Sequence, residues 1–331
     1  MRRKNAKAAL AAVLAAAMLL AGCGGSAQQE ATEKTENTSQ ESAEAPAEET
    51  EAPAAGETEY PLTITDDLGN SVTIEEEPER VVSLSPSNTE TLFALGAGEQ
   101  VVGRTDYCNY PEEAAEVESV GSYSSPNTER IIAMSPDVVF ASDYIDDAVR
   151  SQVEGAGAKV IVFAANDLES VAQDIRTAGQ VLNRNEEAEE IASGMEMDLA
   201  DLQELLAGKE ETRSAFIDLG GYYSAGPGSL LGNVLEDLEV ENVVADTGEA
   251  WPQVSVEKII ESDPDIYISL YTTPDELKQV SGLSSLDCIQ NDQIIYYDGL
   301  SPEADLIQRA GPRLAEGMWL LAGEIYPELL S

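Results

Sequence analysis

Residues 80–90, Arg80-Val-Val-Ser-Leu-Ser-Pro-Ser-Asn-Thr-Glu90, contain the pattern that decides the fold. Within it, 81–84 is a short apolar run typical of a buried strand, and a helix is predicted over 88–95, where Gly96 ends it. The next strand begins at Val101. A strand, a helix and a second strand in close succession form a βαβ unit, which predicts a parallel sheet covered by helices.

The turn after this first strand is also the first candidate site. In parallel α/β sheets, ligands bind beyond the carboxyl ends of the strands, where the N-termini of helices present free N–H groups. Ser87 and Asn88 lie in this turn and are candidate ligand-binding residues. The alternative interpretation is that one of them only caps the helix.

The same alternation continues along the chain and predicts an α/β fold. A β-hairpin is predicted over 62–74. Further strands are predicted over 138–140, 159–163, 215–219, 266–270 and 293–297, and further helices over 146–154, 230–238, 256–261, 274–280 and 304–325. Two Rossmann-like, three-layer lobes explain this order better than one long sheet does.

A predicted helix separates the two halves. Residues 167–182 carry apolar side chains at helical spacing and contain no proline, and Asn183-Arg184-Asn185 interrupts the pattern before a second helix begins. We expect 167–185 to be a bridging helix between an N-terminal lobe at 61–166 and a C-terminal lobe at 186–331. The ligand cleft is expected between these lobes.

The N-terminus has the features of an export signal. Arg2, Arg3, Lys4 and Lys7 precede an apolar run over 8–20, which is too short for a comfortable membrane span. The run ends in Leu20-Ala-Gly-Cys23, which resembles the lipobox of bacterial lipoproteins. We therefore predict that 1–22 is a signal peptide and that Cys23 is lipidated, the alternative being an ordinary signal peptide. Two or more acyl chains would hold the protein at the cell membrane, outside the cytoplasm.

Residues 23–60 follow as a predicted linker. They are rich in Ala, Glu, Thr, Ser, Gln and Pro and have no aromatic residue before Tyr60. Such a segment cannot bury enough apolar surface to offset the entropy of ordering, so we predict a disordered acidic tether between the lipidated cysteine and the folded lobes.

Composition excludes several classes of function. Loss of the four basic residues before Cys23 would leave 14 Lys and Arg against 63 Asp and Glu, a formal charge of −49, which argues against nucleic acid or anionic lipid as a partner. The chain has no histidine, which excludes a Ser-His-Asp or Cys-His nucleophile pair and His-ligated zinc or haem. Cys108 and Cys288 fall in different halves; two free thiols are favoured, and a disulfide is the alternative.

Five segments, in order along the chain, resemble the iron-chelate and vitamin B12 periplasmic-binding family, the substrate-binding proteins of ABC importers. The segments are 80–90, 103–111, 127–137, 251–257 and 309–313. The resemblance implies two α/β lobes joined by a stiff helix, with the ligand in the cleft between them. It also implies a permease in the same membrane as partner, no enzymatic activity, and no cofactor, because the ligand would carry its own metal. We expect a monomer.

The resemblance assigns roles to single residues. Glu129 and Glu257 match carboxylates, one per lobe, that pair with arginines of the permease; the alternative is that each only favours the N-terminal dipole of its helix. Other residues match family positions that line the ligand cleft, or lie in a loop that is expected beside it. These ligand-binding candidates are Tyr107, Tyr123, Ser224, Gly226, Trp251 and Arg309. Packing in the core is the alternative for the three aromatic residues.

The expected ligand is inferred from the kinds of side chain available to the cleft. Free zinc or manganese binders of related architecture use histidines, and a highly anionic ferric siderophore needs basic residues, of which the body has few. A near-neutral corrinoid such as cobalamin is favoured, because aromatic rings suit a flat macrocycle and 251–255 resembles B12 binders. A ferric siderophore or haem stays open, since Tyr123 stands where a tryptophan can occur. An anchored hydrolase using paired carboxylates and a surface adhesion protein are alternatives outside the transport class.

Overall fold

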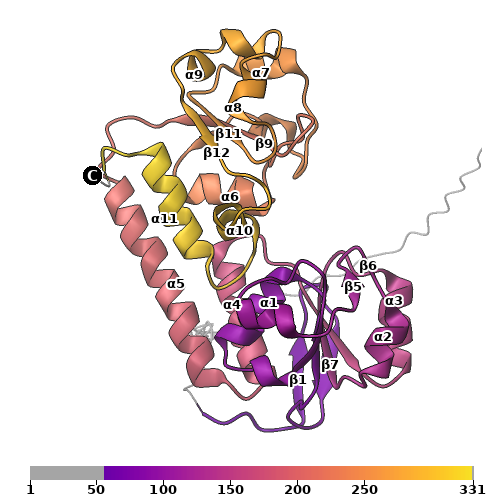
Figure 1. The fold of residues 1–331 in the computed structure, drawn as a ribbon. Helices are drawn as coiled ribbons and strands as arrows, with labels where there is room; N and C mark the ends of the chain where they lie inside the picture. The colour runs from indigo at the N-terminus through magenta and orange to yellow at the C-terminus, as the bar shows by residue number, and fades with distance from the viewer. Residues whose placement is uncertain (1–55, 330–331) are drawn as a thin grey trace, which may run out of the picture. The chain divides into compact units, whose positions relative to one another are not determined.

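Two parallel four-stranded sheets organise the protein, and the computed structural model describes residues 56–329 (Figure 1). The predicted signal peptide, Cys23 and nearly all of the predicted linker lie outside the described residues. All described residues belong to one compact unit. The two separate parallel sheets, each with its own helices, confirm the two-lobed α/β fold expected from the sequence.

The sheet of the N-terminal lobe has the strand order β4-β3-β7-β8, all parallel. Its strands are β3 (Val81–Ser83), β4 (Val101–Arg104), β7 (Val138–Ser142) and β8 (Lys159–Phe163). Its helices are α1 (Pro86–Ala94), α2 (Thr128–Ala133), α3 (Asp147–Gly155) and α4 (Leu168–Val181). Phe140 packs with α1 and α4 on one face, and Val139 packs with α2 and α3 on the other, which makes three layers.

The sheet of the C-terminal lobe has the strand order β10-β9-β11-β12, again all parallel. Its strands are β9 (Ser214–Asp218), β10 (Glu241–Asn242), β11 (Ile266–Ser269) and β12 (Ile294–Tyr296). Its helices are α6 (Leu230–Asp237), α7 (Val256–Ser262), α8 (Pro274–Leu277), α9 (Asp287–Gln290), α10 (Pro302–Gln308) and α11 (Leu314–Ile325). Ile268 faces α6, α10 and α11, whereas Tyr267 faces α7 to α9.

The two lobes repeat one topology. In each four-stranded sheet, the strand that comes first in the chain (β3 or β9) lies second in the sheet, and the helix after it (α1 or α6) leads to the edge strand beside it. Helix α2 precedes β7 in the first lobe as α7 precedes β11 in the second. The pairs α1 and α6, α2 and α7, and β7 and β11 are therefore equivalent positions.

Two short hairpins complete the first lobe. Strands β1 (Leu62–Thr65) and β2 (Ser71–Ile74) pair antiparallel as predicted, and β2 packs beside β8. The second hairpin, β5 (Gly121–Ser122) with β6 (Ser125–Pro126), leads directly into α2. At the start of the described residues, Thr58 N donates to Asn183 Oδ1 at 2.8 Å, which fixes this segment to the turn after α4.

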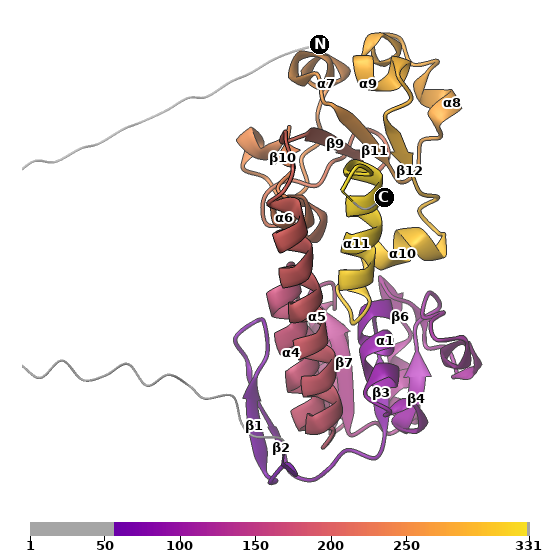
Figure 2. The same ribbon diagram turned by 90° about the vertical axis from the view of Figure 1, so that its left-hand side faces the viewer.

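The connection between the lobes differs from the prediction. Helix α4 begins at a capping box formed by Asp167 and packs on α1 and on α5 (Asn185–Leu206), and the chain reverses at Asn183, where φ is 54°. Figures 1 and 2 show α5 running beside α4 and then beside α11, where Trp319 Nε1 donates to Asp198 O at 3.2 Å. The helix that contacts both lobes is thus α5, not 167–185, because the apolar face of α4 is used on the core of its own lobe.

The predicted closing helix over 304–325 is also wrong. It is two helices, α10 and α11, separated at 309–313. Pro312 has no N–H to continue a helix, and Gly311 adds backbone freedom, so the chain breaks there. The break matters because it frees Arg309 and Arg313 to reach the other lobe.

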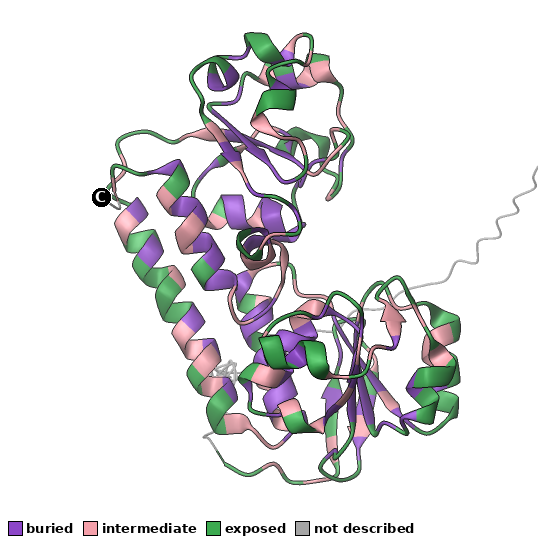
Figure 3. Cartoon of the chain, in the orientation of Figure 1, coloured by how far each residue is buried: buried purple, intermediate pink, exposed green. Residues whose placement is uncertain are grey.

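Burial follows these layers. Figure 3 shows the buried residues along the sheets and the inner faces of the helices, with exposed residues on the outer faces. Between residues 56 and 329, no helix combines the length and apolar character that crossing a membrane requires.

Candidate ligand-binding site

A cavity of about 290 Å³ lies between residues of both lobes. Its wall is formed by Ser85, Ser87, Asn88, Ser142, Asp143, Tyr144, Phe163, Ala164, Ala165, Asn166, Asp174, Gly228, Ser229, Leu230, Trp251, Gln308 and Ala310. Several of these residues stand at the carboxyl ends of β3, β7 and β8, and others at the N-termini of α1 and α6. This is the edge at which parallel α/β sheets bind ligands.

The turn after β3 brings two predicted residues to the cavity. Ser85 caps α1 by accepting a hydrogen bond from Asn88 N at 3.2 Å, and Pro86 occupies the first helical position. Because Ser85 provides the cap, Ser87 and Asn88 are left to line the cavity. The side chain of Asn88 is held in place, since its Nδ2 donates to Ala141 O at 3.0 Å.

The corresponding turn of the second lobe differs in part from the prediction. Ser229 caps α6, and Gly228 and Ser229 line the cavity. Ser224 and Gly226 lie earlier in the same loop and do not line it: Ser224 is fully buried, and a Cβ at Gly226 would collide with the carbonyl of Glu249. These two residues hold the loop rather than face the cavity.

Exposed aromatic rings lie in the cavity wall and next to it. Trp251 and Tyr144 are part of the wall, and the Tyr123 ring lies edge-on to Tyr144 at 6.5 Å and to Tyr107 at 6.3 Å. Their exposed fractions are 44–64 %, so these side chains do not serve core packing. Burial raises the pKa of Tyr271 in the second lobe, with smaller contributions from Tyr123, Asp298 and Asp305.

Tyr144 in the cavity wall, and Tyr271 at the corresponding position of the second lobe, were not predicted from the sequence, although a signal was present. Each follows a buried strand by the same interval, in Ser142-Asp143-Tyr144 after β7 and Ser269-Leu270-Tyr271 after β11. An aromatic residue just beyond the carboxyl end of a buried parallel strand is placed where ligands bind.

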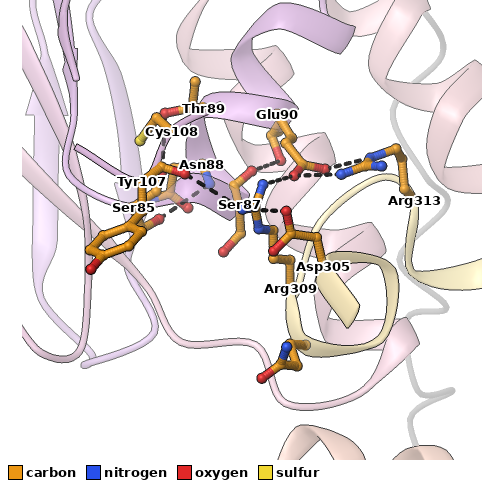
Figure 4. Close-up of polar contacts among 12 residues, drawn as sticks. Ser85, Ser87, Asn88, Thr89, Glu90, Tyr107, Cys108, Asp305, Arg309 and Arg313 are labelled. Carbon is orange, nitrogen blue, oxygen red and sulfur yellow. Dashed lines mark hydrogen bonds and ion pairs between the residues drawn. The ribbon is translucent and has the colours of Figure 1, made fainter. Parts of the chain in front are cut away.

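A buried ion network joins the lobes beside the cavity (Figure 4). Glu90 on α1 is 2 % exposed, and its Oε1 lies 2.6 Å from Arg309 Nη1. Arg313 donates to both carboxylate oxygens of Glu90 at 2.8 Å, and its guanidinium lies 3.6 Å from the centre of the Tyr110 ring. Arg309 also pairs with Asp305 at 2.7 Å.

The network changes the interpretation of Arg309. Its guanidinium, predicted to lie near the ligand, is committed to Glu90 and Asp305, while its neighbours Gln308 and Ala310 line the cavity. Glu90 was not predicted as a site residue, although it ends the segment 80–90. A glutamate within a short helix is normally expected to be exposed to solvent. The two arginine partners of Glu90 lie more than 200 positions away.

A second set of contacts joins the lobes where β8 leads into α4. Asn166 Nδ2 donates to Gly228 O at 2.9 Å, and Asn233 Nδ2 donates to Asn166 O at 2.9 Å. Asn166 and Gly228 both belong to the cavity wall. The lobes are therefore held together at two places that border the cavity.

The cavity wall contains two carboxyl groups and no cationic side chain. Asp143 and Asp174 belong to it, and no Lys or Arg is among the residues that line it. Burial and the neighbouring Asp67 carboxylate raise the pKa of Asp174 to about 8. Over residues 56–329, no group of His, Cys, Asp and Glu is arranged to hold a metal ion. Cys108 and Cys288 are both buried and free, as favoured.

The two predicted docking carboxylates occupy equivalent positions outside the cavity. Glu129 and Glu257 are the second residues of α2 and α7, and each helix is capped by the residue two places earlier, Asn127 or Ser255. Both glutamates are exposed, and neither has a hydrogen-bond or ion-pair partner among the described residues. Their carboxylates are free to pair with another molecule.

A cavity between two α/β lobes, with aromatic side chains in its wall, is typical of a ligand-binding protein. Residues 81–299 match the family model described as periplasmic binding protein. The chain belongs to this family, which confirms the resemblance carried by the five segments.

The individual relatives agree with this assignment. The uncharacterized ABC transporter substrate-binding lipoprotein YvrC of Bacillus subtilis is 34% identical over 96% of each chain. A cobalamin-binding protein of Halobacterium salinarum is 27% identical over 81% of this chain and 74% of its own length. The crystal structure of an ABC-type Fe3+-hydroxamate transport system from Saccharomonospora viridis matches with a TM-score of 0.65 and 26% identity, over 81% of this chain and 99% of that one.

Proposed function

We propose that the protein is the substrate-binding lipoprotein of an ABC importer, which captures a bulky metal-containing nutrient outside the cytoplasm and delivers it to a membrane permease. The observation that carries this proposal is the cavity between the lobes, with Trp251 and Tyr144 in its wall and the Tyr123 and Tyr107 rings continuing edge-on from Tyr144. Membership of the periplasmic binding protein family supports the transport role.

The size of the cavity suggests how a large ligand is held. A volume of about 290 Å³ lies at the lower limit of drug-sized sites, which span about 300–1,000 Å³. A corrin or similar macrocycle would therefore lie across the exposed aromatic rings, whose faces provide apolar area, and would place only a side group inside. The Ser, Asn and Gln side chains of the wall suit the amide groups of such a side chain.

The charge of the wall favours some ligands over others. Asp143 is in the wall and no Lys or Arg is, so an anionic ligand would lack a cationic partner there. Haem, with two carboxylates, and highly anionic ferric siderophores are therefore disfavoured. Cobalamin is the favoured ligand, as the cobalamin-binding relative supports. A neutral or cationic ferric hydroxamate is the second candidate, supported by similarity to the Fe3+-hydroxamate system.

Delivery would use Glu129 and Glu257. Each presents an unpaired carboxylate, and their equivalent positions give one per lobe. Charge-assisted pairs with basic residues of the permease would set the register of the complex and speed the encounter. The double substitution Glu129→Ala with Glu257→Ala should leave ligand affinity unchanged and abolish uptake; normal uptake by this variant would refute the docking role.

Membrane attachment would depend on Cys23, which lies outside the described residues. Cys23→Ala should release the protein from the membrane fraction of the cells that produce it, because the acyl chains supply the anchor. A variant that stays in the membrane fraction would contradict lipidation at this residue.

A ligand panel tests the main proposal. Cobalamin, cobinamide, haem, ferrichrome and ferric enterobactin are titrated into the purified protein by calorimetry, and melting temperature is followed in parallel, since a ligand that binds only the folded state raises it. We expect stoichiometric binding of cobalamin, no binding of haem or ferric enterobactin, and recovery of unchanged ligand. The proposal fails if no member of the panel binds, and turnover of a glycan would favour the hydrolase alternative.

A further inference from the structure

Helices α2 and α7 share more than their glutamates. The first runs Asn127-Thr-Glu-Arg-Ile-Ile132 from its cap, and the second runs Ser255-Val-Glu-Lys-Ile-Ile260. In both, a cap is followed by the free glutamate, a basic residue and two isoleucines. Five of six consecutive positions therefore have the same chemistry at equivalent places of the two lobes, the exception being Thr128 against Val256.

The two isoleucines of each helix have different surroundings. Ile131 and Ile259 are 0% and 1% exposed and attach their helices to the lobe cores. Ile132 and Ile260 are each 36% exposed. A single exposed isoleucine needs no explanation, but equal exposure at the same position of both helices indicates a shared use.

The free glutamate and the exposed isoleucine lie on the same side of each helix. Glu129 and Ile132 are three residues apart, as are Glu257 and Ile260, and residues at this spacing are neighbours on a helix surface. Each helix thus presents one carboxylate beside one apolar side chain.

The basic residue between them is turned to its own lobe. Arg130 Nη1 donates to Ser119 O at 3.1 Å, and Lys258 Nζ pairs with Asp246 at 2.8 Å. Neither cation pairs with the neighbouring glutamate, so each surface has an unneutralised negative charge beside an isoleucine. The complementary partner carries a cation bordered by apolar surface, and it presents this pair of groups to both lobes.

We propose that Ile132 and Ile260 are apolar contacts of the permease, so that each lobe docks through a glutamate–isoleucine pair. The inference rests on the proposed docking role of Glu129 and Glu257. The carboxylate orients the encounter, and the isoleucine adds contact area that water leaves when the complex forms.

The test compares uptake with ligand binding. Ile132→Ser and Ile260→Ser are made singly and together in the full-length lipoprotein, and initial uptake is measured in its own cells at limiting amounts of the protein. The probe is radiolabelled cyanocobalamin, or iron-labelled ferrichrome if the ligand panel selects the hydroxamate. Leu68→Ser and Met197→Ser are matched controls, because both side chains are apolar, exposed by 52% and 64%, and distant in sequence from α2 and α7.

We expect unchanged ligand affinity for every purified variant. Uptake should fall roughly two- to fivefold for each single isoleucine variant and about tenfold for the double variant, as burial of a partly exposed isoleucine implies. The controls should transport normally. Normal uptake by the double variant, or an equal loss in the controls, overturns the inference.

The outcomes separate this inference from the function on which it rests. If the double glutamate variant loses uptake while the double isoleucine variant keeps it, the docking role stands and the isoleucine contacts are refuted. If the double glutamate variant transports normally, the docking role fails and the inference fails with it. If neither probe binds the purified protein, the proposed ligand class is at fault and both are overturned.

Discussion

Removal of the Glu90 carboxylate should loosen the junction between the lobes more than any other single change to the ion network. The side chain of Glu90 is 1% exposed, and those of Arg309 and Arg313 are 11% and 18% exposed. Glu90→Gln keeps the shape but removes the charge that both guanidinium groups share. Arg309 would retain Asp305, whereas Arg313 would lose its carboxylate partner and keep its contact with the Tyr110 ring.

The magnitude follows from these partners. Breaking a buried ion pair from one side costs about 3–5 kcal/mol, because an uncompensated buried charge is left. We expect the lower end, about 3 kcal/mol, since Arg309 keeps one carboxylate and the amide oxygen of glutamine still accepts a hydrogen bond. For a protein of this size that corresponds to a fall in melting temperature of roughly 6–10 °C. Arg309→Met should cost less, about 1.5 kcal/mol, because Arg313 continues to bind both oxygens of Glu90.

Urea and thermal unfolding of the purified protein measure the effect, and ligand titration measures its consequence for the site. Because Gln308 and Ala310 flank Arg309 and line the cavity, Glu90→Gln should also weaken ligand binding. Glu113→Gln is the matched control: Glu113 is exposed, and its change should stay within about 0.5 kcal/mol of the native protein. A Glu90→Gln variant as stable as this control would refute the role of the buried network.

Three further predictions concern other parts of the molecule. The pKa of Asp174 is about 8 in the folded protein, above the ordinary value near 4, so the folded state holds a proton that the unfolded state releases. Stability should therefore fall as pH rises from about 4 to about 8, and Asp174→Asn should flatten that slope in urea titrations; an unchanged slope would contradict the assignment. Cys108 and Cys288 are buried, and burial raises the pKa of Cys288 to about 11, so a thiol reagent should label both only after unfolding, and rapid labelling of the native protein would be inconsistent with this. Trp251→Ala should weaken ligand binding roughly tenfold, as loss of a large aromatic contact implies, with melting temperature nearly unchanged because Trp251 is half exposed; native affinity would exclude it from the site.

The strands could be predicted because buried parallel strands appear as continuous apolar runs bounded by polar turns. The run over 159–163 coincides with β8, and the helix predicted over 230–238 is α6 to within one residue. The role of the long connection could not be predicted in the same way. Periodicity gives the apolar face of 167–182 but not the core against which it packs, and only the reversal at Asn183 assigns α4 to the first lobe.

The site shows the same limit. Ser87, Asn88 and Trp251 were found because turns after strands and aromatic residues in polar surroundings are local signals. Glu90 was not found, since its meaning depends on two arginines brought to it by a break in the last predicted helix. A charged residue inside a short helix carries no local sign that it will be buried.

The repeated topology separates positions that the lobes share from positions that they do not. Capped helix N-termini at α1 and α6, the Ser-x-Tyr segments after β7 and β11, and the glutamate–isoleucine surfaces of α2 and α7 all occur twice. The ion network centred on Glu90 joins the lobes without such a counterpart, and Asp143 in the cavity wall has the buried Leu270 at its equivalent position. A partner that contacts both lobes alike can use only the repeated features, whereas a ligand of no internal symmetry must be distinguished by the unrepeated ones. Ligand selectivity should therefore change through Asp143 without loss of docking, and docking should change through α2 and α7 without loss of selectivity.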